Sequence, residues 1–210
     1  MCGVFGFMAH RDGPVNLKVV RRMAANTMNR GPHAFGFAWV DSRDRLRCFK
    51  QTGRIVDHLG LLAMAADAKI LIGHCRFATH GTPANNLNNH PHPCDGGWIV
   101  HNGVIGAYEE IVARRDLRPV TECDSEVLGL IIEQEDGNLL ERCVKATLES
   151  GRTPLVMLGL WARPHRLVIV RRGNPLSVGK TKVGTYFASL PDALPGQVSQ
   201  FADGSAEELF

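Results

Sequence analysis

The order of elements along the chain predicts a layered α+β domain. Strand-like segments gather toward both ends of the sequence, and helical patterns fall mainly between them. That grouping favours segregated layers of sheet and helix over a regularly alternating parallel sheet. No repeat, low-complexity segment or linker rich in Pro, Gly or Ser interrupts the 210 residues, so we expect a single domain over 1–210.

Apolar runs and turn residues predict the elements of the first part. Residues 3–9 form an almost continuous apolar run, which predicts a buried strand. A helix is expected over 15–29, where the pattern ends before a Gly-Pro turn. Two strand-like runs, 35–40 and 46–52, flank the polar DSRDR turn and predict a β-hairpin.

The middle of the chain combines one helix, two strands and a long polar segment. Asp57 is a suitable N-cap for a helix over 57–66, and the apolar run 70–77 predicts a strand. The polar stretch 79–97 is expected to form a loop, and 98–104 is again strand-like.

The rest of the chain has a helical part and a strand-rich part. Helical patterns occur over 107–114, 123–135 and 138–148. Short apolar runs then predict three strands, over 155–161, 166–171 and 184–189.

Composition excludes several functional classes. Hydrophobic residues make up 44% of the chain and charged residues 21%, which is ordinary for a globular protein with a sizeable core. A net charge of +3, with the basic residues scattered, gives no argument for nucleic acid or a membrane surface as a partner. No apolar run reaches the roughly 18 to 20 residues of a membrane span, and no secretory signal is evident. We therefore expect a cytoplasmic protein whose six cysteines are reduced.

Cys2 is the first candidate for chemistry. Methionine aminopeptidase removes Met1 when the next side chain is small, so the mature chain would begin with Cys2. Its α-amine, with a pKa of about 7.7 to 8.0, could then act as the base for a thiol of about 8.5. The simpler alternative is a small residue at the start of a strand.

A histidine-rich segment is the second candidate. Such a density of imidazole and thiol groups would suit zinc. However, the segment contains neither C-x-x-C nor H-x-x-x-H, and no glutamate to act as a base. We therefore expect no metal at this segment. The alternative is a metal-dependent hydrolase that uses these histidines and cysteines. For each histidine alone, the simplest interpretation is a loop residue that is hydrogen-bonded to the backbone. The segment contains His74, Cys75, His80, His90, His92, Cys94 and His101.

Two further segments carry groups suited to an amino-acid substrate. Arg76 ends a predicted strand and Thr79 follows three residues later, so a guanidinium and a hydroxyl could hold a carboxylate. A surface ion pair is the alternative role for Arg76. Asn102-Gly103 offers a side-chain amide and an approachable backbone N–H, the donor pair of an oxyanion hole, although Asn-Gly is also a common tight turn.

Asp124 and a glycine-rich segment each allow two interpretations. Thr121-x-x-Asp124 resembles a helix capping box, whereas a carboxylate at this position could instead hold a substrate ammonium. The segment 173–181, GNPLSVGKT, places five residues between its glycines where a phosphate-binding loop has four. We therefore expect no nucleotide there.

Taken in order, these segments resemble the class II glutamine amidotransferases, whose glutaminase domains use an N-terminal cysteine. MCGVFGF is similar to their nucleophile strand, and NRGPHAFGFAWV to their RGP or RGY segment. GHCRFATHG and NNHPH resemble GHTRWATHG and NAHPH of glucosamine-6-phosphate synthase. VHNGVI resembles the oxyanion-hole strand and TECDSEVL a helix start, while RRGNPLSVG with YFAS resembles an ordinary strand pair of the same domain. The small bacterial amidotransferase-like proteins share the GPH sequence and the RPV before the helix start.

The resemblance implies a four-layer αββα sandwich of the N-terminal nucleophile hydrolase type, without a cofactor. It implies hydrolysis of the side-chain amide of L-glutamine to glutamate and ammonia. Such a domain leaves only 191–210 unused, so the ammonia acceptor is expected on a separate synthase polypeptide. The implied roles are Cys2 as nucleophile with its own α-amine as base, Asn102 and Gly103 as oxyanion hole, Arg76, Thr79 and His80 for the α-carboxylate, Asp124 for the α-ammonium, and His90 as support of the glutamine pocket.

Three positions depart from the family pattern. Phe77 stands where the synthase has Trp, Cys75 where it has Thr, and His33 where Asp or Tyr is common. An unprocessed Met1 would also block the α-amine of Cys2. A non-catalytic, glutamine-binding regulatory module and hydrolysis of another amide therefore remain as alternatives.

Overall fold

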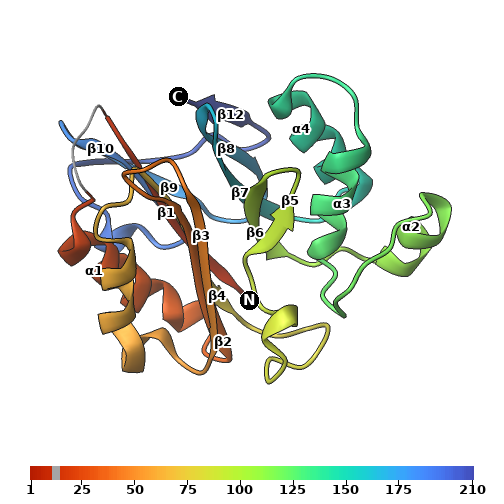
Figure 1. Ribbon diagram of the computed structural model, residues 1–210, viewed down its shortest axis with the longest axis horizontal. Helices are drawn as coiled ribbons and strands as arrows, with labels where there is room; N and C mark the ends of the chain where they lie inside the picture. The colour runs from red at the N-terminus through yellow and green to blue at the C-terminus, as the bar shows by residue number, and fades with distance from the viewer. Residues whose placement is uncertain (11–14) are drawn as a thin grey trace.

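A computed structural model of the chain describes residues 1–10 and 15–210 (Figure 1). Over those residues the strands form two antiparallel sheets, of seven and five strands. The seven-stranded sheet runs in the order β11 (Gln197–Gln200), β9 (Ser177–Lys180), β10 (Gly184–Ala188), β1 (Gly3–Ala9), β4 (Ile70–Arg76), β2 (Ala34–Val40) and β3 (Leu46–Thr52). The five-stranded sheet runs in the order β12 (Ala206–Leu209), β8 (His165–Arg172), β7 (Leu155–Ala162), β6 (Gly97–Gly103) and β5 (His92–Cys94).

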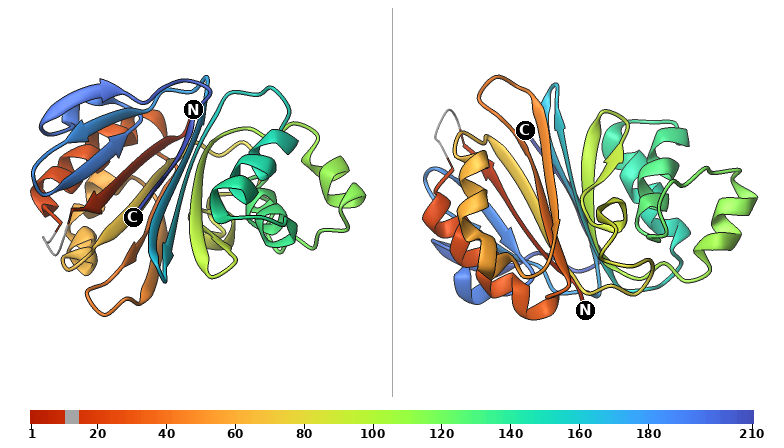
Figure 2. Two further views of the ribbon diagram at one scale, coloured as in Figure 1. Left: turned by 90° about the horizontal axis from the view of Figure 1, so that it is seen from above. Right: turned by 60° about the horizontal axis from the view of Figure 1, so that its bottom comes forward.

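Helices cover the outer faces of both sheets, as Figure 2 shows. The α-helix α1 and the 3-10 helix η2 pack on the seven-stranded sheet, and α3 and α4 pack on the five-stranded sheet. This arrangement confirms the expected αββα layers. The helices are α1 (Leu17–Thr27), η1 (Met28–Arg30), η2 (Ile55–Ala65), η3 (Asn86–Asn88), α2 (Tyr108–Arg114), α3 (Glu126–Gln134), α4 (Leu139–Glu149) and η4 (Pro191–Ala193).

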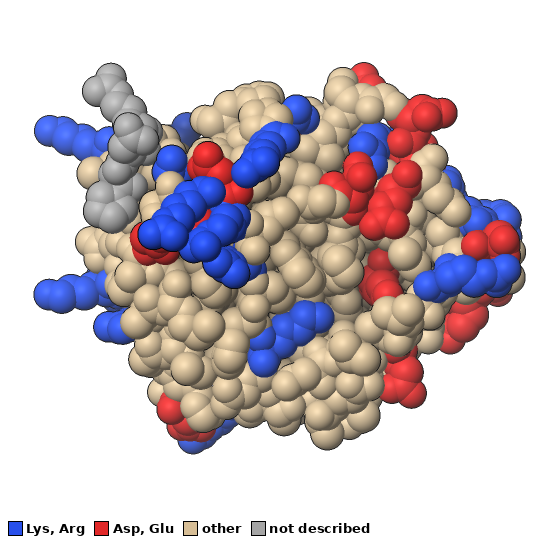
Figure 3. All heavy atoms as spheres, viewed as in Figure 1, with Lys and Arg blue, Asp and Glu red and all other residues tan. Residues whose placement is uncertain are grey.

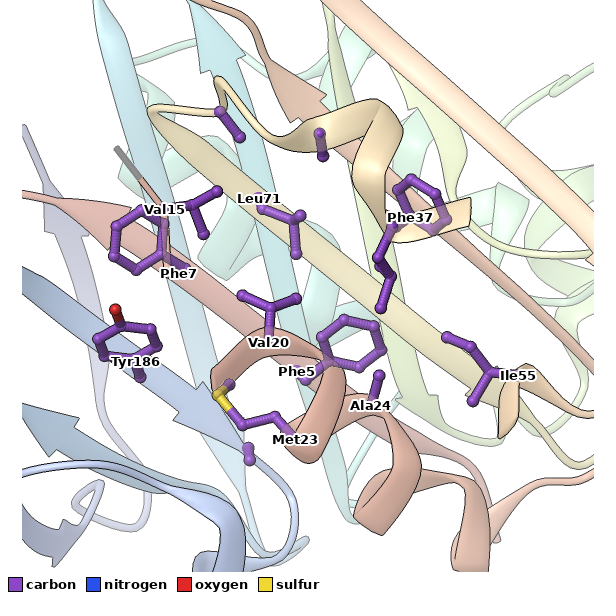
Figure 4. Close-up of a cluster of buried hydrophobic side chains, with 14 of the residues drawn as sticks. Phe5, Phe7, Val15, Val20, Met23, Ala24, Phe37, Ile55, Leu71 and Tyr186 are labelled. Atoms are coloured by element: carbon purple, nitrogen blue, oxygen red, sulfur yellow. The ribbon is translucent and has the colours of Figure 1, made fainter. Parts of the chain in front are cut away.

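Strand β1 is buried on both faces because it separates two of the three hydrophobic cores. Phe5 and Phe7 point toward the core beneath α1, which Figure 4 shows in close-up. Val4 and Met8 point the other way, into the core between the sheets. Side chains alternate between the faces of a strand, so a continuous apolar run is what two buried faces require. Gly73 on β4 accommodates the Phe5 ring, since a Cβ there would lie 2.1 Å from Phe5 Cζ.

Two predicted helices differ from the structure. The helix expected over 57–66 is a 3-10 helix, η2, interrupted by non-helical angles at His58. Asp57 does not cap it and instead accepts a hydrogen bond from Arg54 Nε at 3.0 Å. The His58 ring stacks on Phe35 with a centroid distance of 5.8 Å, so tertiary packing replaces regular helical geometry there. The helix expected from residue 123 begins at Glu126, and Thr121 donates its N–H to Glu126 rather than forming a capping box with Asp124.

Short strands occur where only loop or tail was expected. Strand β5 lies within the segment 79–97 and pairs with β6. Strand β11 pairs with β9 in one sheet, and β12 pairs with β8 in the other. The C-terminal segment 191–210 is therefore part of both sheets. The segment that resembles a phosphate-binding loop carries β9, which pairs with β10 as an ordinary strand pair.

On the face drawn in Figure 3, acidic and basic side chains are both present, and a wide area carries neither. None of the described helices is long and apolar enough to cross a membrane.

Candidate active site

The candidate catalytic residues lie around one cavity of about 390 Å³ at the ends of β1, β4 and β6. Cys2 directly precedes β1, and its neighbour Gly3 pairs with Cys75 on β4. Asn102 and Gly103 end β6, and Figure 1 places the N-terminus beside the loop that follows β4. The cavity is lined by Met1, Cys2, Phe77, Thr79, Asn102, Gly103, Val104, Thr153, Pro154 and Asn174.

The Cys2 thiol is held against the backbone of Phe77. The Phe77 N–H donates to Cys2 Sγ at 3.3 Å, and Sγ lies 3.4 Å from the Phe77 carbonyl oxygen. Burial raises the pKa of the Cys2 thiol, and this exceeds the opposing effects of the Phe77 N–H, the N-terminal ammonium and Arg76. Arg30 fixes the Cys2 backbone, because its Nε donates to the Cys2 carbonyl at 2.8 Å. The thiol is thus positioned but protonated near neutral pH, so it needs a base.

Asn102 lines the same cavity and carries an amide donor without a partner among the described residues. The residue is 1% exposed, and the unpartnered atom is its Nδ2. Its backbone is fixed by Asn174, whose Nδ2 donates to the carbonyls of Asn102 at 2.8 Å and Pro154 at 3.2 Å. A buried amide donor without a partner is unusual and suits a group that appears only during a reaction.

Gly103 is required by its surroundings. A Cβ at this position would lie 2.5 Å from His101 Nε2 and 2.9 Å from the Pro154 carbonyl oxygen. Only glycine therefore fits between these groups without a shift. Asn174 was not singled out from the sequence, although it lies in the GNPLSVG segment, and its role is visible only from its two carbonyl partners.

Arg76 lies behind the cavity rather than in its wall. It is 2% exposed, and its Nη1 donates to Asn89 Oδ1 at 2.8 Å. Nη2 donates to the carbonyls of His80 and of Gly81, the latter at 3.0 Å. In this state Arg76 organises the loop that follows β4, while Thr79 on that loop lines the cavity. The simple surface ion pair considered for Arg76 is wrong, because the side chain is buried.

Asp124 lies near His80, which brings two of the candidate substrate-binding residues together. Asp124 is 3% exposed, and its Oδ2 accepts the Ile105 N–H at 2.7 Å. His80 Nδ1 lies 3.8 Å from Asp124 Oδ1, and the His80 ring meets Tyr108 edge-on. Asp124 is thus held by the turn after β6 instead of capping α3.

The other histidines of the rich segment form a buried group. His74 Nε2 contacts the His101 carbonyl at 3.0 Å, and His101 Nδ1 contacts Ser125 Oγ at 2.8 Å. Burial lowers the pKa of His74 to about 3 and the pKa values of His90 and His92 well below the usual range. These imidazoles are therefore neutral and do not serve as proton donors near neutral pH.

Comparison with known proteins identifies the family. No family model matches the chain. The chain is 34% identical over 191 residues to glutamine–fructose-6-phosphate aminotransferase (isomerizing) of Yersinia pseudotuberculosis and 33% identical over 192 residues to that of Legionella pneumophila. Each alignment covers 85% of this chain. The chain belongs to the class II glutamine amidotransferase family.

Two solved structures share the fold of this chain. Glutamine phosphoribosylpyrophosphate amidotransferase of B. subtilis superposes with a TM-score of 0.75 at 21% identity, covering 99% of this chain and 49% of that one. A glutamine aminotransferase class-II domain protein of Silicibacter pomeroyi gives a TM-score of 0.68 at 15% identity, covering 99% of this chain and 94% of that one. This chain spans only about 30% of the length of the two aminotransferases described above.

Proposed function

We propose that this chain hydrolyses the side-chain amide of L-glutamine to glutamate and ammonia through a γ-glutamyl thioester on Cys2. One observation carries the proposal. Cys2 and Asn102 line the same cavity, and the Asn102 Nδ2 has no hydrogen-bond partner among the described residues. A nucleophile and a donor for the developing oxyanion are the two groups that acyl transfer needs at one carbon. The sequence identity of 33–34% to two glutamine–fructose-6-phosphate aminotransferases supports glutamine as the substrate.

The proposed first step forms the thioester. After Met1 is removed, the free α-amine of Cys2 takes the thiol proton, and the thiolate attacks the amide carbon of glutamine. Asn102 Nδ2 and the Gly103 N–H stabilise the tetrahedral oxyanion. The resulting α-ammonium returns its proton to the amide nitrogen, the C–N bond breaks, and ammonia leaves.

The second step regenerates the enzyme. Water loses a proton to the α-amine and attacks the thioester carbon, and the same two donors stabilise the second oxyanion. The C–S bond then breaks, the thiolate recovers its proton, and glutamate is released. One water is consumed for each ammonia produced.

The zwitterionic end of glutamine would be held by the loop after β4 and by Asp124. Thr79 and His80 would bind the α-carboxylate, with Arg76 joining them when its loop carbonyl partners rearrange. Asp124, which is buried and already oriented by Ile105, would hold the α-ammonium. His90 lies behind this region, next to the Arg76 partner Asn89, and would support the pocket wall.

The ammonia is proposed to pass to an acceptor site outside the fold described above, on a synthase domain or a partner. The support is that the alignment covers only 30% of each of the two aminotransferases, so most of their length has no counterpart in the matched region. Affinity purification from the native host should recover a partner enzyme. That partner should use glutamine as its source of ammonia only when this chain is present. Recovery of the chain alone, with no effect of candidate synthases on its glutamine turnover, would contradict a dedicated partner.

The decisive experiment compares the native chain with Cys2→Ala, using Cys48→Ala as the matched control. Glutamine-dependent ammonia release and covalent labelling by an electrophilic glutamine analogue should both disappear in Cys2→Ala and persist in Cys48→Ala. Mass spectrometry of the native protein should show a chain that begins with Cys2. Retained turnover in Cys2→Ala would refute the proposal, and a stable chain that keeps Met1 and binds glutamine without turnover would favour the regulatory module.

A further inference from the structure

A cluster of three metal-ligating side chains lies outside the cavity. His90 and His92 belong to the segment that enters β5, and Cys123 lies just before α3. One ligand atom from each residue can be chosen so that all three atoms lie within 4.8 Å of one another. The three residues are at most 3% exposed, and none of them lines the cavity. The proposed glutaminase chemistry does not require this cluster.

The two histidines of the cluster have unmet hydrogen-bonding capacity. Both ring nitrogens of His90 and both of His92 are buried and have no partner within residues 1–10 and 15–210. The rings contact other imidazoles without hydrogen bonds. The His74 ring stacks on His90 with a centroid distance of 3.9 Å, and His90 meets His92 edge-on with a centroid distance of 4.6 Å. Buried polar atoms without partners are rare in folded proteins and call for a ligand or water.

We infer that His90, His92 and Cys123 bind a zinc ion. Two imidazole nitrogens and one thiolate are a donor set that zinc favours, with Zn–N of about 2.0–2.1 Å and Zn–S of about 2.3 Å. Tetrahedral coordination at those lengths separates the ligand atoms by about 3.4–3.6 Å, so a pair at the 4.8 Å limit must approach by up to about 1.4 Å. Side-chain rotation can supply that movement, and the fourth position is available to water.

The charge and proton changes balance. Zinc binding replaces the proton of the Cys123 thiol, which passes to solvent. The two neutral imidazoles lose nothing, so the complex carries one net positive charge. Asp124 offsets it, because its Oδ1 lies 3.8 Å from Cys123 Sγ. The positive charges of Arg76, which acts on both histidines, and of Lys50, which acts on His92, oppose binding, so the thiolate is the necessary member of the ligand set.

The zinc would join two segments that support the proposed substrate pocket. His90 follows Asn89, the side-chain partner of Arg76. Cys123 precedes Asp124. A zinc ion between them would therefore fix the separation of Arg76 from Asp124. The inference departs from the sequence-based expectation of no metal, because Cys123 lies outside the histidine-rich segment and reaches it only in the folded chain.

The test measures metal content, so it is independent of glutaminase activity. The untagged full chain would be stripped with a chelator, reloaded with Zn²⁺, desalted and examined by elemental analysis and thermal unfolding. We expect about one zinc per chain and a higher melting temperature than in the stripped protein. Less than about one tenth of an equivalent after reloading would overturn the inference and leave buried water as the partner of the histidines.

Cysteine variants locate the metal. Cys2→Ala should retain the zinc, whereas its loss there would assign the metal to the N-terminal cysteine and overturn the inference. Cys123→Ser and His92→Gln should weaken zinc binding by more than about tenfold, while Cys143→Ser, a buried cysteine in α4, should not. Equal zinc affinity in Cys123→Ser and Cys143→Ser would refute the site. If Cys123→Ser fails to fold, Cys2→Ala loaded with Co²⁺ provides the test of Cys123 as a ligand. We expect a thiolate-to-cobalt absorption band, and its absence would contradict ligation by Cys123.

Discussion

Replacing Asn102 by alanine separates catalysis from stability. The Asn102 Nδ2 donor has no partner among the described residues, so truncation breaks no hydrogen bond of that group in the resting protein. In the proposed reaction the same donor meets the oxyanion only as the thioester forms and breaks. Asn102→Ala should therefore impair turnover while leaving the folded state almost unaffected.

The magnitudes follow from these two states. Loss of one oxyanion-hole donor lowers kcat by about 10²- to 10³-fold, equivalent to roughly 2.7–4 kcal/mol. The stability cost should stay within about 1 kcal/mol, because the small cavity left behind is offset by removal of a buried donor whose isolation itself costs about 1–3 kcal/mol.

Asn174→Ala is the matched control, since it should show the opposite pattern. Its Nδ2 donates to the carbonyls of Asn102 and Pro154, so its loss should destabilise the fold by about 1–2 kcal/mol. It should lower kcat less than Asn102→Ala does. The assays are glutamine-dependent ammonia release and urea denaturation for both variants. A kcat of Asn102→Ala within threefold of the native value, or a fall in its stability beyond that of Asn174→Ala, would refute the reasoning.

Three further substitutions test the surrounding structure. Gly103→Ala should cost about 1–3 kcal/mol in thermal unfolding and abolish turnover, since the new Cβ would lie 2.5 Å from His101 Nε2; native-like unfolding would contradict the fit. Asp41 has a pKa lowered to about 2, chiefly by backbone and side-chain hydrogen bonds that outweigh its burial. Its stabilisation is therefore complete above the unfolded pKa of about 3.9 and is lost as the pH falls toward 2, so Asp41→Asn should cost about 2 kcal/mol in urea denaturation at pH 7 and progressively less below pH 4. A pH-independent cost would refute that assignment. Asn138→Ala should cost about 1 kcal/mol and reduce α4 protection in hydrogen exchange, because it removes the capping box with Glu141; unchanged protection would contradict it.

The parts of the fold that could be predicted are those with strong local patterns. The run from Gly3 to Ala9 is apolar because both faces are buried, and strand is the expected result. Strands β11 and β12 could not be predicted, because QVSQ and AEEL are short, largely polar edge segments whose order comes from pairing with β9 and β8. Likewise, η2 departs from a regular helix because the His58 ring packs on Phe35, a contact with no local signal.

The candidate site divides in the same way. Cys2, Asn102 and Gly103 could be singled out because each carries its chemistry in its own residue type and position. The partners of Arg76 could not, because the His80 and Gly81 carbonyls reach it only through the conformation of the loop after β4. The grouping of Cys123 with His90 and His92 depends on how α3 packs near β5, which no spacing in the sequence encodes.

The place of β1 in the sheet also bears on the order of events during synthesis. Its register joins Phe5 to Gly73 on one side and to Ala188 on the other. The strand therefore gains its second neighbour only after residues 184–188 have emerged from the ribosome, and such long-range pairing is slow to form. Met1 is 73% exposed in the folded chain, so its removal need not precede this pairing. A nascent chain that ends before Asn174 lacks one of the side chains that line the cavity, so it would not yet carry the complete proposed site.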